Sequence, residues 1–129
     1  MIPPPRFLDL DDILEIHGEA VAKYGGSPGV RDMGLLQSAL AAPQSGSGDQ
    51  YFHTTIHEMA AAYLFHLVQN HPFIDGNKRT GAMAALAFLD INGIWIRGSN
   101  PWLEELTLMT AQGKMKKAEI AEAFRKHSG

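Results

Sequence analysis

The stretch TIHEMAAAYLFHLVQNHPFIDGNKRTGAMAALAFLDIN, residues 55–92, decides the fold of this chain, because two apolar helical segments flank one short polar loop. The first segment, 55–70, carries apolar side chains on nearly every side of a helix. The second segment, 77–92, is rich in alanine, and Gly93 follows it as a residue that suits a helix C-terminus. Helices that are apolar all round belong in the interior, so the sequence predicts two central helices joined by the loop.

The rest of the chain also has the periodicity of helices. Apolar residues at helical spacing, with Gly, Pro or polar residues at the ends, predict further helices over 9–24, 32–42, 100–112 and 117–127. Asn100-Pro101 has the form of an N-cap and first-turn pair. The segment QSGSGDQY (44–51) is typical of a loop, and Ile94–Ile96 of a short extended piece. We therefore expect an all-α fold, a compact bundle around two central helices, formed by residues 1–129 as a single domain.

Composition and charge narrow the class of protein. Apolar residues make up 45% of the 129 residues and charged residues 19%, which excludes intrinsic disorder. The net charge of −3 disfavours a dedicated nucleic-acid binder, so we expect no direct nucleic-acid partner. The longest apolar stretch, Gly81–Leu89, is too short to span a bilayer, and no signal peptide follows Met1, so we expect a cytoplasmic protein with no membrane contact. The absence of cysteine excludes disulfides, thiolate metal sites and cysteine nucleophiles.

The loop HPFIDGNKR, residues 71–79, concentrates groups that bind phosphates and act on them. Pro72 disfavours helix at His71, which places this histidine, a common general base, where a buried helix meets the loop. Asp75 supplies a hard oxygen ligand of the kind that magnesium uses beside nucleotide phosphates. A glycine and two cations follow at the N-terminus of the next helix, a position that favours bound anions. Together these groups indicate phosphoryl or nucleotidyl transfer.

A purely structural interpretation of the loop stays open at this point. His71 alone suits a hydrogen bonder at a helix end, Asp75 suits a turn, and the two cations suit a solvated helix face. Phe73 and Ile74 are apolar within a polar turn, so we expect both to anchor the loop to the core.

Residues outside the loop have simpler predicted roles. We expect His17 and His127 on exposed helix faces, and His66 as a hydrogen-bonded histidine of the core. Gly81 lies inside a helix, where close packing against the other central helix explains it best. The segment 43–53 is a candidate for holding a target segment beside the loop.

The loop, extended to HPFIDGNKRT, resembles the signature of the Fic/Doc superfamily, whose Fic branch has the pattern H-x-F-x-(D/E)-G-N-G-R-x-x-R. Lys78 stands where Fic enzymes have their second glycine, and Ala82 stands where they have their last arginine. Both departures are those of the Doc (death-on-curing) branch, with a pattern close to H-x-F-x-(D/N)-x-N-K-R. The similarity to Doc toxins extends to GVRDMGLL (29–36), to FLDING (88–93) and to the overall length.

The resemblance implies a Fic-like fold and a role for each residue of the loop. The catalytic base would deprotonate a target hydroxyl, an acidic residue would hold magnesium, and the following residues would bind the phosphates of ATP. The residues implied for these roles are His71 as the catalytic residue, Asp75 as the metal ligand, and Gly76, Asn77, Lys78 and Arg79 as the residues that bind ATP.

The resemblance also implies an activity and partners. Doc toxins are toxin components of type II toxin–antitoxin systems and act as protein kinases. With ATP and magnesium they phosphorylate a threonine of elongation factor Tu, so that protein synthesis stalls. A Phd-like antitoxin, usually encoded beside the toxin, blocks this activity in trans. Two alternatives stay open: a Fic-like transfer of AMP to a protein hydroxyl, and an inactive module that keeps only its antitoxin-binding surface.

Overall fold

The computed structural model describes residues 3–96 and 100–128 of the chain, and these ranges are almost entirely helical. In chain order the elements are α1 (Leu10–Tyr24), α2 (Met33–Ala41), the 3₁₀ helix η1 (Ala42–Gln44), β1 (Gly46–Ser47), β2 (Gln50–Tyr51), α3 (Ile56–Asn70), α4 (Asn77–Ile91), α5 (Pro101–Ala111) and α6 (Lys117–His127). The all-α class predicted from the sequence is confirmed. None of the helices in the described ranges has the length and apolar character needed to cross a membrane.

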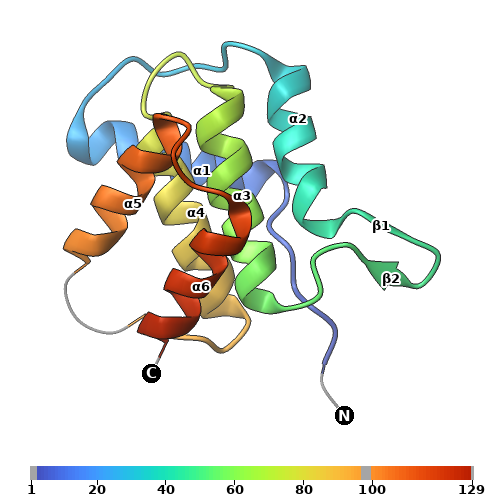
Figure 1. Ribbon diagram of the computed structural model, residues 1–129. Coiled ribbons are helices and arrows are strands. Elements are labelled where there is room, and N and C mark those ends of the chain that lie inside the picture. Colours follow the sequence, from blue (N-terminus) through green and yellow to red (C-terminus); the bar gives the residue numbers. More distant parts are fainter. Residues whose placement is uncertain (1–2, 97–99, 129) are drawn as a thin grey trace.

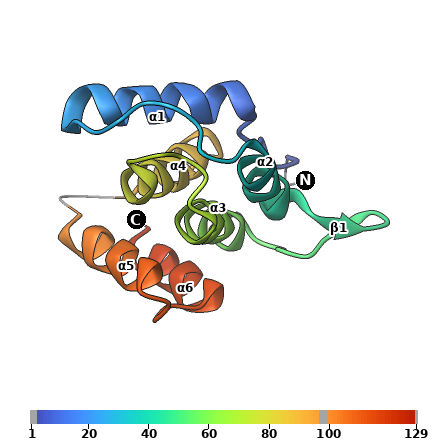
Figure 2. The ribbon, with the colours of Figure 1, turned by 90° about the horizontal axis from the view of Figure 1, so that it is seen from above.

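The helices α3 and α4 form the centre of the molecule (Figure 1). They pack against each other, and α3 also packs against α2 and α6. Seen from above, α1 crosses one side of this pair while α5 and α6 cover the other side (Figure 2). The two helices predicted to be central are therefore α3 and α4, and the other α-helices pack around this pair.

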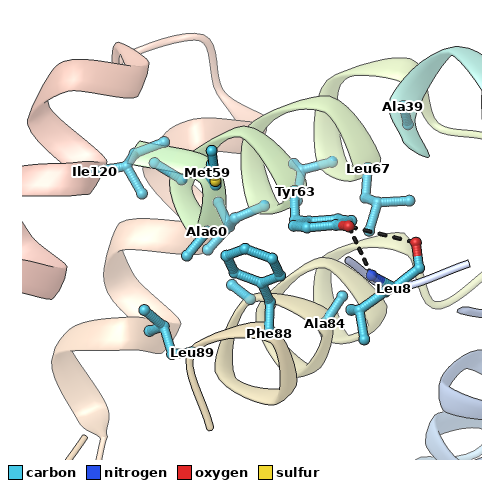
Figure 3. Close-up of a cluster of buried hydrophobic side chains, with 14 of the residues drawn as sticks. Leu8, Ala39, Met59, Ala60, Tyr63, Leu67, Ala84, Phe88, Leu89 and Ile120 are labelled. Atoms are coloured by element: carbon cyan, nitrogen blue, oxygen red, sulfur yellow. Dashed lines mark hydrogen bonds between the residues drawn. The ribbon is translucent and has the colours of Figure 1, made fainter. Parts of the chain in front are cut away.

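The core lies along the contact between α3 and α4. Tyr63 and Phe88 are fully buried there, with ring centroids 5.0 Å apart (Figure 3). The Tyr63 hydroxyl accepts from the Leu8 amide at 2.9 Å and donates to the Leu8 carbonyl at 3.3 Å, which ties the N-terminal segment to the core. Burial raises the pKa of Tyr63 to about 12. Gly81 lies at this contact as predicted, because a Cβ there would come within 2.9 Å of Val68 Cγ2.

Polar residues cap the helices where the sequence places them. Asp9, Asp32 and Thr55 each precede a helix and accept a hydrogen bond from the amide three residues further on. The helices predicted from 9, 32 and 55 therefore begin one residue later. Glu58, at capping-box spacing from Thr55, accepts instead from the Thr54 hydroxyl at 3.1 Å. Asn100 is the N-cap residue of α5, but its side chain makes no capping hydrogen bond within the described residues.

The segment 44–51, predicted as a loop, contains a small antiparallel hairpin in which Gly46 pairs with Tyr51. The hairpin lies at the N-terminal end of α3, whereas the loop 71–76 follows its C-terminal end (Figure 1). A 15-residue helix is about 22 Å long. The expectation that the segment 43–53 lies beside the loop is therefore wrong. Ile96 forms a bridge with Ser128, as suits an extended piece at 94–96.

Candidate active site

His71 ends α3 and opens the loop in a conformation that requires support. Its backbone is left-handed, with φ 51° and ψ 53°, the one non-glycine residue with positive φ in the described ranges. Arg31 supplies the support: Nε donates to the His71 carbonyl at 2.7 Å and Nη2 donates to the Asn70 carbonyl at 3.0 Å. A guanidinium at this end of a helix also suits the helix dipole. The His71 side chain is exposed, as a base that meets a substrate must be.

The connection between α1 and α2, residues 25–32, lies along the loop. Val30 and Phe73 form an antiparallel bridge, and the Ile74 amide donates to the Gly29 carbonyl at 3.2 Å. Phe73 is fully buried and anchors the loop as expected. The same expectation for Ile74 is wrong, since 54% of this residue is exposed, because it follows Phe73 on the outer face of the short extended pair.

Asn77 holds the loop from inside. It is 4% exposed, and its side-chain oxygen accepts from the Phe73 amide at 2.9 Å while its side-chain nitrogen donates to the Phe73 carbonyl at 3.0 Å. With both polar groups used in this way, Asn77 shapes the backbone of the loop. The side chain is therefore not free to bind ATP, and a role of Asn77 in ATP binding through its backbone stays a prediction.

Asp75 presents its carboxylate at the start of α4. Oδ1 accepts from the Gly76 amide at 2.9 Å, and Oδ2 accepts from the Ser27 amide at 3.3 Å. Gly26 is packed so closely that a Cβ there would lie 2.9 Å from Oδ2. In the described ranges, no group of three or more His, Asp or Glu side chains is arranged so that it could hold a metal ion. One exposed carboxylate nevertheless fits magnesium, because this ion commonly takes one or two carboxylates and completes its shell with water and substrate phosphates.

Gly76 begins α4 with φ 78° and ψ 18°, a left-handed conformation that glycine adopts without strain. No side chain caps the first turn of α4. The first amides of the helix and the positive end of its dipole are therefore available to a bound anion. The backbone has the geometry that the sequence predicts, and its binding of an anion stays a prediction.

Lys78 and Arg79 are exposed on the first turn of α4, and neither pairs with a carboxylate in the part of the chain that the structure describes. The Arg79 guanidinium lies 3.7 Å from the ring centroid of Tyr24, at the end of α1. Both cations line a groove of about 610 Å³ between α1, α4 and α5, and Ala82 lines it as well. This volume falls within the range of small-molecule sites. Lys78 and Arg79 thus form part of the wall of this groove.

His17 is a residue of this site that the sequence analysis missed. It was expected on an exposed face of α1 but is 5% exposed, and it lies against the loop. The expectation is wrong because His17 shares a face with Ile13 and Ala20, and this face packs toward α4. The spacing of these two apolar residues is the signal that could have placed it.

The other histidines with predicted roles lie on the α6 side of the fold. Lys117 of α6 makes hydrogen bonds with His66 Nε2 at 3.2 Å and with His53 Nε2 at 3.3 Å. Burial and the Lys117 charge lower the pKa of His66 to about 4. His66 is hydrogen-bonded as predicted, but it is half-buried and does not belong to the core. His127 is half-buried against Trp102 rather than exposed.

The fold and the loop define a class of protein: helical domains in which two central helices are joined by a histidine-containing loop beside an uncapped helix N-terminus. The sequence profile of the Fic/DOC family matches residues 7–89, which include α1 to α3 and all of α4 except its last two residues. The chain belongs to this family, in its Doc branch, as its resemblance predicts.

Two relatives are similar to the chain over long stretches. The protein kinase doc of Escherichia phage P1 is 31% identical over 124 residues, which cover 96% of this chain and 97% of that protein. The toxin Doc of Mycolicibacterium smegmatis is 42% identical over 89 residues, 69% of this chain and 66% of that protein. The chain is thus similar to the phage protein over nearly the full length of both.

Proposed function

We propose that this chain is a Doc-type toxin of a type II toxin–antitoxin system and that it phosphorylates a protein hydroxyl with ATP and magnesium. The observation that carries this proposal is the start of α4, where a helix N-terminus without a side-chain cap, two exposed cations and a carboxylate follow His71 within eight residues. Similarity to a relative named protein kinase doc, over 96% of the chain, supports transfer of a phosphoryl group over transfer of AMP.

In this proposal His71 accepts the proton of the acceptor hydroxyl. The acceptor oxygen forms a bond with the γ-phosphorus of ATP as the bond from that phosphorus to the β,γ-bridging oxygen breaks, and ADP leaves. The α4 amides, Lys78 and Arg79 balance the negative charge that the phosphates carry through the reaction. Asp75 would hold magnesium, which neutralises phosphate charge and orients the transferred group.

The proposed acceptor is a threonine of elongation factor Tu, and the proposed regulator is a Phd-like antitoxin. A target in the translation machinery would place the protein in the cytoplasm. The groove beside Lys78 and Arg79 is the favoured site for the antitoxin, because it joins an apolar surface that includes Leu108 to two cations, with Glu104 as the one acidic residue of its lining. A helix with apolar residues on one face and a carboxylate at one end has the chemistry that fits this groove.

The test is transfer of label from ATP to purified elongation factor Tu. The γ-labelled nucleotide should label the protein, and the α-labelled nucleotide should not. Labelling from the α position alone would favour the AMP transferase instead. Transfer of neither label, with an antitoxin still bound, would favour the inactive binding module.

Two variants and one control make this assay specific. His71→Ala should fold normally and lose about 10²–10⁴ in rate, because a general base contributes that much. Lys78→Gly restores the Fic pattern at one position and should lose about 10²–10³ in γ-phosphoryl transfer, since a cation close to the reacting phosphates is removed. Lys126→Ala removes an exposed lysine from the last turn of α6 and should leave the rate unchanged. A wild-type rate in His71→Ala would refute the mechanism.

The antitoxin is tested separately with the product of the gene beside the toxin. Leu108 is 49% exposed in the groove, so Leu108→Asp should leave the fold intact and weaken binding of that product. Phosphoryl transfer by the free toxin should not change. Unchanged binding would place the antitoxin elsewhere on the surface.

A further inference from the structure

His17 lies under the loop and touches three of its residues. Its ring stacks on Phe73, with centroids 3.8 Å apart and planes 6° apart. Its Nε2 lies 2.8 Å from the Asp75 carbonyl oxygen. A Cβ built on Gly76 would lie 3.6 Å from the same nitrogen, so the ring also borders the backbone where α4 begins. With 5% of its surface exposed, the His17 side chain is shielded from solvent by the loop and its surroundings.

The hydrogen bond from His17 fixes the direction of one peptide group. A carbonyl oxygen only accepts, so Nε2 carries the hydrogen and donates it. A peptide group is planar and trans, so the Gly76 N–H points opposite to the Asp75 C=O. Because His17 holds this C=O toward the interior, the Gly76 N–H points outward, where it donates to Asp75 Oδ1 at 2.9 Å. One buried imidazole thereby orients the Asp75–Gly76 peptide, which carries the Asp75 carboxylate on one side and leads into the first turn of α4 on the other.

We propose that His17 is a positioning residue: it holds the Asp75–Gly76 peptide so that the Asp75 carboxylate and the first amides of α4 face the bound phosphates. The kinetic part of this inference rests on the proposed phosphoryl transfer, whereas the orientation of the peptide is measurable without it. A residue that only fills space under the loop would be replaced equally well by any ring of the same size. The experiment therefore removes the N–H donor and the aromatic ring in separate variants.

Two substitutions at position 17 make this separation. His17→Phe keeps a ring that stacks on Phe73 and removes the N–H donor. His17→Gln removes the ring and keeps an N–H donor near the place of Nε2. The matched control is His127→Phe, because the His127 ring also stacks on an aromatic ring at 3.8 Å, and its Nδ1 lies 2.8 Å from the Ala123 carbonyl oxygen, but on α6.

Three quantities are measured on each variant: the melting temperature, the rate of γ-phosphoryl transfer, and the ¹⁵N–¹H resonance of Gly76 with its response to inorganic pyrophosphate. We expect His17→Phe to stay folded, to lose about 10- to 100-fold in kcat, as is typical when a partner that orients a metal-binding carboxylate is removed, and to shift the Gly76 resonance. His17→Gln should recover most of the rate. His127→Phe should leave the rate and the resonance unchanged.

Each contrary outcome overturns the inference. A wild-type rate and an unmoved Gly76 resonance in His17→Phe would show that the ring only packs. If His17→Phe does not fold, the glutamine variant decides: a folded His17→Gln that loses activity as fully as His71→Ala contradicts the donor role. If the wild-type chain transfers no label, the proposed function fails, but the Gly76 resonance and its pyrophosphate response in His17→Phe still decide the role of His17.

Discussion

Replacing Gly81 by alanine sets two effects of known size against each other. Alanine in place of glycine inside a helix stabilises it by about 0.8–1 kcal/mol. The new Cβ, however, would lie 2.9 Å from Val68 Cγ2 and 3.3 Å from the Leu64 carbonyl oxygen. Val68 is β-branched and has one preferred rotamer in a helix, and the Leu64 oxygen belongs to the backbone of α3, so neither atom gives way easily. Overpacking of this kind costs about 1–3 kcal/mol, which leaves a net destabilisation of about 1 kcal/mol.

The assay is thermal and urea unfolding of Gly81→Ala beside Gly18→Ala. Gly18 lies inside α1, is exposed, and has no atom within 4 Å of its built Cβ. Alanine at position 18 should therefore raise the free energy of unfolding by about 0.5–1 kcal/mol. For a domain of this size, 1 kcal/mol corresponds to roughly 3–5 °C in Tm, so the two variants should shift in opposite directions. A rise in Tm for Gly81→Ala as large as that for Gly18→Ala would refute close packing of α3 on α4.

Three further predictions concern pH, magnesium and the N-terminal segment. The pKa of His66 is lowered to about 4 in the folded state, so between about pH 6.5 and 4 the unfolded chain takes up a proton that the folded chain does not. The free energy of unfolding should fall over this range by about 1–2 kcal/mol after solvent screening, and His66→Gln should flatten the curve measured with urea. Asp75→Asn should keep the fold and require more magnesium for half-maximal transfer, whereas an unchanged magnesium titration would remove Asp75 from the metal site. Tyr63→Phe should lower the free energy of unfolding by about 1–3 kcal/mol, because the Leu8 amide and carbonyl lose a buried partner; a change below 0.5 kcal/mol (about the effect of an ordinary surface substitution) would contradict this reasoning.

The features that the sequence predicts correctly are encoded locally. The apolar character of 55–70 and 77–92 places two helices in the centre, and helix starts follow directly after residues that suit an N-cap position, such as Asp32 or Gly76. The chemistry of the loop is local too, because its groups lie within nine consecutive residues, 71–79. Local spacing therefore suffices for the helices and for the identity of the site, although the role of each site residue stays a prediction.

The features that the sequence does not predict are contacts between distant segments. Ser27 and Asp75 are 48 positions apart, Arg31 and His71 40, and His17 and Asp75 58. Helical periodicity says which face of α1 is buried, but it says nothing about which residues lie opposite that face. The contact of His17 with Asp75 and the support of the loop by residues 25–32 follow from how α1 and α2 pack on α3 and α4, and such packing depends on the whole chain.

The support of the loop by residues 17–32 has a consequence for how activity is lost on heating. The Arg31, Ser27 and His17 contacts come from the outer α1 side of the fold, whereas α3, α4 and α6 contribute most of the side chains of the buried core. Partial opening of one segment costs less free energy than global unfolding where it exposes less apolar surface. Amide protons of the Ile74 and Arg31 backbone should therefore exchange with solvent through such an opening sooner than those of Tyr63 or Phe88. We therefore expect the geometry of the loop, and with it the proposed activity, to be lost at a lower temperature than the helices unfold.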